Sequence, residues 1–278
     1  MDILHFFYQT TAGRVLLKPL VCRPVSQVCG AFLDTKASKI FIKPFQRGYG
    51  IETEEYDLSD IQSFNDFFYR PLKPGKRKIS YDPHTLIAPC DALLTAVPIQ
   101  NGSVFPVKQS QFELEQLLRF EKLAEEYKGG VCLIFRLWVN HYHRYCYVDS
   151  GKKEHDVFIP GILHTVQPVA LHNRPVFVEN CRSITVLESK SFSKVIQAEV
   201  GALLVGKIVN NHPEAGTVTR GEEKGHFAYG GSTILVLLKK DTAVLREDIL
   251  LASKSGTETP VKMGEGIGQS KRTLTKNC

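Results

Sequence analysis

The sequence predicts an α+β protein in which a helical N-terminal segment packs on a β-rich body. Of the 278 residues, 43% are hydrophobic and 23% are charged, so the chain can bury a substantial core and is not a disordered protein. Residues 1–50 interleave cations with apolar clusters, whereas the chain after Gly129-Gly130 consists of short β-type runs separated by turn residues. We therefore expect a helical segment over residues 1–60 and a β-rich body over residues 61–278.

The N-terminal segment carries most of the positive charge of the chain. Residues 1–50 contain seven Lys or Arg residues against two Asp residues, a net charge of +5, and the whole chain has +6. Apolar residues at 3–7 and 15–21 alternate with these cations, a composition typical of a helix that lies on an anionic membrane surface. The alternative is a solvated basic face on ordinary core-packing helices.

The composition also indicates where the protein works and what it does not bind. No segment reaches the ~18 apolar residues of a spanning helix. The Met-Asp start does not resemble a signal peptide, so we expect a peripheral protein on the cytoplasmic face of a membrane. No basic stripe interleaved with aromatic residues occurs after residue 50, which argues against nucleic acid. A reduced compartment and no metal site are expected, because the seven cysteines show neither a CxxC pair nor metal-ligand spacing: Cys22, Cys29, Cys90, Cys132, Cys146, Cys181 and Cys278.

Local patterns predict the elements of the body. Pro71 to Pro74 indicates a surface connection from the helical part. Residues 111–125 place apolar residues near helical spacing among good helix formers and predict a surface helix at about residues 110–128. The stretch 255–268 predicts a loop and a short strand before a loose tail. Apolar runs predict strands at 131–139, 144–148, 183–187, 195–209 and 232–238.

One short motif points to chemistry. Gly230 and Gly231 directly precede Ser232, which opens an apolar run. Glycines permit strained or left-handed backbone, so the serine oxygen can approach the preceding carbonyl, as an N-to-O acyl shift requires. Alone, such a tetrapeptide indicates no more than a tight turn into a strand.

Five further segments, in order along the chain, accompany this motif. The five are Phe64-Asn-Asp-Phe-Phe-Tyr-Arg-Pro-Leu-Lys-Pro-Gly-Lys-Arg, Ala88-Pro-Cys-Asp, His141-Tyr-His-Arg-Tyr-Cys-Tyr-Val-Asp-Ser-Gly, Gly161-Ile-Leu-His-Thr-Val-Gln-Pro and Glu199-Val-Gly-Ala-Leu-Leu-Val-Gly-Lys-Ile. Together the six segments resemble the phosphatidylserine decarboxylase family, and the resemblance covers about residue 60 to the end.

The resemblance implies a self-processing proenzyme of phospholipid biosynthesis, a lyase. Ser232 would attack the carbonyl of Gly231, and the chain would divide into a β chain (1–231) and an α chain (232–278) that begins with a pyruvoyl group made from Ser232. This covalent cofactor would decarboxylate phosphatidylserine to phosphatidylethanolamine through a Schiff base with the substrate amine. The implied partners are an anionic phospholipid surface and a second copy, as a homodimer of processed α/β pairs.

The resemblance also implies site residues, with one departure from the family pattern. Asp91 matches an aspartate that orients the base for the serine. The family shows Tyr-His-Arg-x-His, and here His143 matches the first histidine while Cys146 replaces the second, which serves as that base. Three residues remain candidates for the base: Cys146, His141 and His143. We favour His143, because an ordinary thiol is a poor base at neutral pH.

Two other functions remain open. The first is a pyruvoyl-dependent decarboxylase of a free amino acid, with aromatic amino acids among the candidates. The second is a membrane-associated binding protein that is no longer processed because Cys146 replaces histidine. The cationic residues Lys73, Lys76, Arg77 and Lys78 fit either contact with lipid phosphates or a solvated loop.

Overall fold

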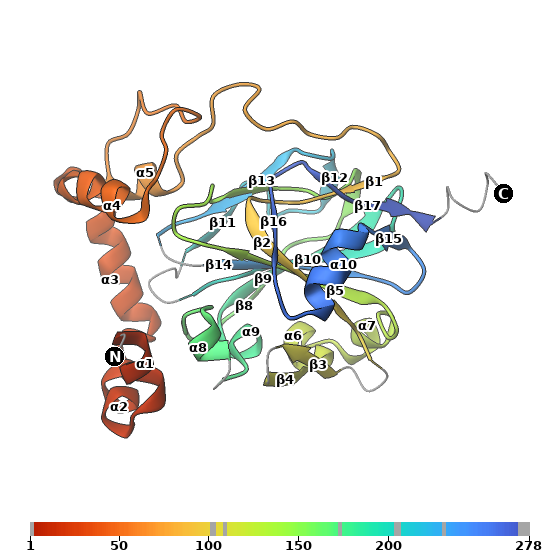
Figure 1. Cartoon of the computed structure of the whole chain (residues 1–278), viewed down its shortest axis with the longest axis horizontal. Coiled ribbons are helices and arrows are strands. Elements are labelled where there is room, and N and C mark those ends of the chain that lie inside the picture. Colours follow the sequence, from red (N-terminus) through yellow and green to blue (C-terminus); the bar gives the residue numbers. More distant parts are fainter. Residues whose placement is uncertain are drawn as a thin grey trace.

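The computed structural model describes residues 3–100, 104–107, 110–171, 174–202, 207–229 and 232–271. Its N-terminal helices form a column along one side of a β-rich body (Figure 1). Helix α2 begins after Thr10, whose hydroxyl accepts from the Gly13 N–H at 2.9 Å, and α4 ends at Gly50 in the left-handed conformation. The column contains α1 (Ile3–Gln9), α2 (Thr11–Leu20), α3 (Arg23–Leu33), η1 (Lys36–Phe41) and α4 (Ile42–Tyr49), and α5 (Phe64–Phe68) packs beside α4.

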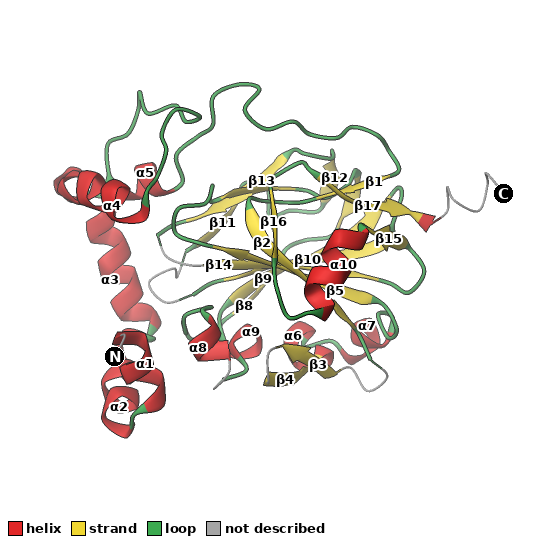
Figure 2. Cartoon of the chain, in the orientation of Figure 1, coloured by secondary structure: helices red, strands yellow, loops and turns green. Residues whose placement is uncertain are grey.

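The body is built on an antiparallel sheet of nine strands in the order β12-β7-β9-β10-β14-β5-β2-β16, with β8 also paired to β9 (Figure 2). These strands are β2 (Ala92–Pro98), β5 (Val131–Leu137), β7 (Gly151–Lys153), β8 (Val157–Ile159), β9 (Arg182–Ser189), β10 (Ser193–Val200), β12 (Gly216–Val218), β14 (Ser232–Leu238) and β16 (Thr259–Val261). The smaller sheets contain β1 (Thr85–Ile87), β3 (Val104–Val107), β4 (Ser110–Glu113), β6 (Arg144–Cys146), β11 (Ile208–Asn210), β13 (Glu223–Phe227), β15 (Ala243–Leu245) and β17 (Gly266–Ser270).

Both faces of the main sheet are buried. On one face Ile134, Ile196 and Leu235 pack against helices, including α1 and α2. On the other, Leu133, Phe135 and Ile234 pack against the smaller sheets and α10. The covering helices of the body are α6 (Leu114–Leu118), α7 (Glu121–Glu125), α8 (Pro168–Leu171), α9 (Val176–Glu179) and α10 (Glu247–Lys254). Since both faces are covered, the central strands are apolar on both sides.

The strand register brings four chain segments to one edge of the sheet. Ser232 at the start of β14 lies opposite Leu137 at the end of β5, and Thr233 lies opposite Val200 at the end of β10. Leu93, near the start of β2, lies opposite Arg136. The residues that continue from these strand ends therefore border Ser232, and they include three of the sequence motifs.

The expected fold class is confirmed at the level of a β-rich body with N-terminal helices. In the described part of the chain, no helix is both long enough and apolar enough to cross a membrane. The strand expected at 232–238 is β14, whereas the strand expected at 195–209 ends at Val200, and β11 begins at Ile208. The division of the chain at residue 60 stays a prediction.

The single helix expected at about residues 110–128 is confirmed only in part. Residues 110–113 form β4, and the remainder is two short helices, α6 and α7. Arg119 separates them with φ 57°, so the first helix closes in the left-handed conformation, with the Arg119 N–H donating to the Glu115 carbonyl at 2.6 Å. Helical periodicity persists across such a break, and no glycine marks it in the sequence.

Candidate functional site

Ser232 is a buried hydroxyl without a hydrogen-bonding partner. The residue has 0% exposed surface, and its Oγ atom contacts no donor or acceptor in the described part of the chain. An unsatisfied buried hydroxyl costs about 1–3 kcal/mol, so its presence calls for a chemical reason. Gly230 and Gly231 lie outside the described residues.

The segment after β5 folds two histidines back towards this edge. Trp138 to His141 form a turn in which the His141 N–H donates to the Trp138 carbonyl at 3.0 Å. The Trp138 N–H in turn donates to Nδ1 of His141 at 3.1 Å. His143 follows with no exposed surface, and its Nδ1 atom lies 3.0 Å from the His141 carbonyl. Both rings are thus held by backbone groups of one tight turn.

These contacts assign different tautomers to the two rings. Nδ1 of His141 accepts a hydrogen bond, so in the neutral ring the proton is on Nε2. Nδ1 of His143 faces a carbonyl and carries the proton, which leaves its Nε2 lone pair unprotonated and without a partner among the described residues. Of these two rings, His143 is the one with a lone pair available as a base.

Burial keeps both imidazoles neutral. Desolvation lowers the pKa of His141 from 6.5 to about 4, although the nearby charge of Asp91 acts in the opposite direction. Burial and then the Arg70 guanidinium hold the pKa of His143 well below its usual value. Each ring therefore remains unprotonated at neutral pH.

An aromatic cluster connects His143 to the chain just before the Gly-Gly pair. The ring centroid of Phe68, in α5, lies 4.0 Å from that of His143 and 5.2 Å from that of Tyr229. Tyr229 also contacts Phe64 and Phe45, so helices α4 and α5 cover this side of the site. The apolar cover excludes water from His143.

Asp91 lies at the start of β2 and is bound by cations and a backbone donor. Arg77 donates to both carboxylate oxygens, at 2.9 and 2.5 Å, and the Met263 N–H donates to one of them at 2.9 Å. Lys262 approaches to 3.6 Å. In the described part of the chain no histidine donates a hydrogen bond to Asp91, so its influence on His141 is through charge.

This contact corrects the expectation for Arg77. Its side chain is only 6% exposed and also pairs with Glu55 at 2.9 Å, so it is neither a solvated loop residue nor available to lipid phosphates. Lys73 donates to the Glu54 carbonyl at 2.9 Å and remains exposed. The run of four cations hid one buried member, because sequence alone does not show which residue of a basic run turns inwards.

Cys146 is buried and holds its proton. Its residue ends β6, its N–H donates to the Pro89 carbonyl at 2.9 Å, and its sulfur lies 4.0 Å from the Ala88 carbonyl. Burial raises the pKa of the thiol to about 12. The sulfur of a protonated thiol is a very weak proton acceptor, so this residue is poorly suited to act as the base.

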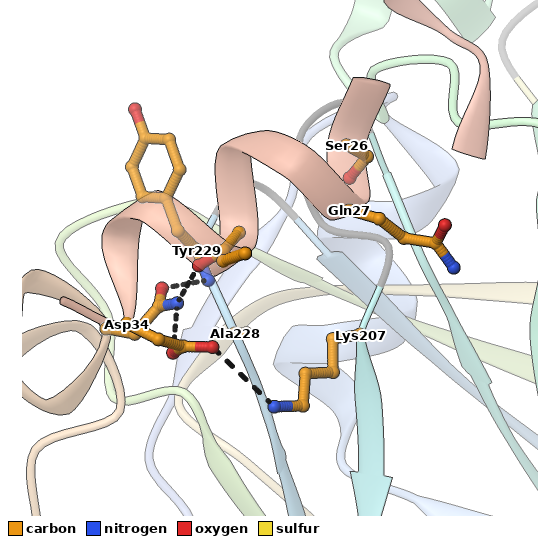
Figure 3. A pocket seen from close by; sticks show the side chains of 9 residues that line it. Ser26, Gln27, Asp34, Lys207, Ala228 and Tyr229 are labelled. Carbon is orange, nitrogen blue, oxygen red and sulfur yellow. Dashed lines mark hydrogen bonds and ion pairs between the residues drawn. The ribbon is translucent and has the colours of Figure 1, made fainter. Parts of the chain in front are cut away.

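A cavity of about 260 Å³ opens beside the chain that leads to Ser232 (Figure 3). It lies between α3 and the segment that contains Ala228 and Tyr229. Asn65 donates to Asp34 at 2.7 Å, and its side-chain oxygen accepts from the Tyr229 N–H at 3.3 Å. Lys207 approaches Asp34 to 3.9 Å across the opening. The cavity therefore lies where α3 meets the segment that precedes Ser232 in the chain.

The sequence-based reasoning missed several contributors to this site. Arg77, Phe68 and Asn65 all belong to the segment 64–77, in which we predicted no catalytic residue. His226 stacks on Tyr69 with ring centroids 4.2 Å apart, and its Nδ1 atom lacks a partner. A dense group of aromatic residues beside a polar motif was the available signal for this cluster.

Comparison with known proteins gives a consistent result. The family profile described as phosphatidylserine decarboxylase matches residues 64–269. The chain is 44% identical over 268 residues to phosphatidylserine decarboxylase proenzyme 2 of Clostridium acetobutylicum, covering 96% of this chain and 91% of the relative. It is 39% identical over 278 residues to the phosphatidylserine decarboxylase proenzyme of Ruminiclostridium cellulolyticum, with 98% and 93% covered. The proenzyme of Clostridium perfringens is 37% identical over 273 residues, with 96% and 93% covered.

Proposed function

The chain belongs to the phosphatidylserine decarboxylase family, and on that premise we propose which of its residues carry the reaction and where the enzyme works. Like its family, it is a pyruvoyl-dependent carboxy-lyase of phospholipid biosynthesis that is made as a proenzyme. Its substrate is phosphatidylserine, which sets aside the free amino acid and the non-catalytic binding protein as alternatives.

Ser232 is the proposed nucleophile of self-cleavage. Its Oγ attacks the carbonyl carbon of Gly231 while Nε2 of His143 accepts the hydroxyl proton, and the proton then passes to the departing amino group. The resulting ester eliminates the β chain (1–231) as a carboxylate, and hydrolysis of the residual dehydroalanine releases ammonia. The buried, unpartnered Oγ of Ser232 and the free lone pair of His143 support this assignment.

The pyruvoyl group supplies an electron sink for the carbon–carbon bond that breaks on loss of CO₂. The residues around Ser232 fit such a group, because the site is dry, apolar on one side and provides a hydroxyl free to react. We assign to His143 the proton transfers at this position in turnover as well as in processing. Asp91, held by Arg77, contributes negative charge near His141.

A peripheral position on an anionic membrane is proposed for the N-terminal helices. Residues 1–50 carry a net charge of +5 and also expose large apolar side chains. The most exposed are Val15 (59%), Leu16 (56%), Val28 (72%) and Ile40 (72%). These residues would enter the lipid interface while the cations contact the headgroups. The homodimer of processed pairs stays a prediction, which light scattering of the processed protein tests.

Denaturing mass spectrometry of freshly purified protein tests the assignment of Ser232. We expect two fragments that meet between residues 231 and 232, the second with a blocked N-terminus in place of serine. The Ser232→Ala variant should remain one chain and have no decarboxylase activity. A catalytically competent wild-type protein that is uncut, with an unmodified serine at 232, would contradict the proposal.

A further inference from the structure

We propose that a second cavity, bounded by α2 and the loop at residues 162–165, binds the phosphodiester of the lipid substrate. This α2 cavity has a volume of about 560 Å³. Three cations line it: Arg14 and Lys18 from α2, and Arg174 from the start of the α9 region. The inference rests on the proposed function and names the residues that recognise the phosphate.

The charge of the α2 cavity favours an anion. Against its three cations stands Glu179, which lies 3.8 Å from Arg174 and 3.5 Å from His164, so the local balance is about +2. His164 adds no charge, because burial and then the charge of Arg174 lower its pKa to about 4. Arg14 and Lys18 are exposed and stand one helical turn apart, as convergent donors to a phosphate would.

The walls of the α2 cavity are held in place by buried polar contacts. The Tyr8 hydroxyl, in a residue only 3% exposed, lies 3.0 Å from Nδ1 of His164 and accepts from the Thr165 N–H at 3.1 Å. The Leu163 N–H donates to the Val21 carbonyl at 3.0 Å. These bonds fix α1 and α2 against the loop, so the cations of α2 have a defined position relative to the body.

A single buried side chain connects this loop to the strand beside Ser232. Asn180 accepts from the His164 N–H at 2.9 Å and donates to the His164 carbonyl at 2.8 Å. It also donates to the Gly201 carbonyl at 2.7 Å. Gly201 follows Val200, which lies opposite Thr233 in the sheet. One side chain, Asn180, therefore links the lining of the α2 cavity to the residue that follows the end of β10, on the strand next to β14.

The remaining lining indicates a lipid rather than free phosphate. Leu17 and Val21 form a buried apolar wall, and Ile162, 37% exposed, lies at the rim. Val15 and Leu16 of the same helix are exposed and would contact acyl chains beside the headgroup. A cavity with cations on one side and apolar residues on the other matches a glycerophosphoserine headgroup joined to acyl chains.

The double variant Arg14→Ala/Lys18→Ala tests the assignment with a monomeric short-chain phosphatidylserine, whose turnover does not depend on membrane docking. We expect KM to rise on the order of 10-fold while kcat stays within about 2-fold and the α fragment still forms, since two charge-assisted contacts are lost. Lys152→Ala/Lys190→Ala removes two exposed positive charges from the body and should leave KM unchanged. In the wild type, sn-glycero-3-phosphoserine should inhibit better than serine or inorganic phosphate, and the double variant should lose this preference.

The outcomes separate this inference from the function on which it rests. A variant with unchanged KM for the short-chain substrate, or with a higher KM only on vesicles, would overturn the α2 cavity as a substrate subsite. Equal inhibition of the wild type by inorganic phosphate would also overturn it. Processed wild-type protein that does not decarboxylate phosphatidylserine at all would contradict the proposed function instead.

Discussion

Two buried polar regions of this protein differ in how their atoms are partnered. Around Lys224, charged side chains with no solvent contact are paired with opposite charges: Lys224 lies 2.6 Å from Glu199 and 3.9 Å from Asp156. By contrast, the Oγ atom of Ser232 and Nε2 of His143 have no hydrogen-bonding partner in the part of the chain that the structure describes. The first arrangement pairs opposite charges in a low-dielectric interior, whereas the second contains a buried hydroxyl and a buried unprotonated ring nitrogen, neither of which has a hydrogen-bonding partner in the described residues.

The chemical type of the unpartnered buried atoms distinguishes the proposed reaction centre from the ion-paired region. Orphaned atoms alone do not, since Oε1 of Gln197 also lacks a partner in the described part of the chain. At the sheet edge, however, the orphaned atoms belong to a hydroxyl and to an unprotonated imidazole nitrogen, and the residues before that hydroxyl are two glycines. The region around Lys224 also contains an unpartnered atom among the described residues, Oε1 of Glu199, but the other oxygen of that carboxylate pairs with Lys224 at 2.6 Å.

After loss of Ser232 itself, we expect the replacement of His143 to have the largest effect on the rate of self-cleavage. His143→Ala removes the proposed base, so the rate of self-cleavage should fall by about 10²–10⁴-fold. The time course of α-fragment formation after synthesis in vitro measures this rate, and added imidazole should restore part of it. Cleavage at the normal rate would assign the base to another group, with His141 and His226 as the next residues to substitute.

Breaking the pair around Lys224 should act on stability instead of chemistry. Lys224→Met leaves Glu199 buried without its cation and should lower the free energy of unfolding by about 3–5 kcal/mol. The double variant Lys224→Met/Glu199→Gln should recover much of that loss, and both variants should still cleave at the Ser232 bond. Each variant is also made in the Ser232→Ala background, which is not cleaved, and urea unfolding of these proteins measures the effect on stability. If Lys224→Met stops cleavage without loss of stability, the region takes part in the chemistry.

The same contrast explains what the sequence could and could not predict. Ser232 and strand 232–238 followed from a glycine pair before an apolar run, because these are local features. The tautomers of His141 and His143 depend on a turn whose hydrogen bonds no pattern shows. The partner of Asp91 was equally hidden, since Arg77 is 14 positions away and reaches it only through the fold. Family motifs identified the participants, and packing determined which atoms remained free.

The pH dependence of stability tests whether the buried histidines are neutral in the folded protein. His141, His164 and His226 each have a folded pKa of about 4 against 6.5 when unfolded, so between these values the unfolded chain binds more protons. Stability should therefore be complete above about pH 6.5 and fall as pH decreases towards 4, by up to about 1.4 kcal/mol per pH unit for each histidine. Urea unfolding of Ser232→Ala at several pH values measures the slope, which His164→Gln should reduce. A flat profile would mean that these rings are not held neutral.

The smallest effect is expected at Cys146, where the family pattern would have placed the base. Burial raises the pKa of its thiol to about 12, so the thiol is protonated at neutral pH, and its sulfur lies 4.0 Å from the Ala88 carbonyl. The thiol therefore offers no good proton acceptor. Cys146→Ala should leave the cleavage rate within about 2-fold and lower stability by only about 1 kcal/mol, the loss of a small buried group. Measuring the cleavage rates of Cys146→Ala and His143→Ala under the same conditions shows which of the two residues acts as the base for Ser232. Were Cys146→Ala to abolish cleavage while His143→Ala did not, the free lone pair at the sheet edge would have no part in self-processing.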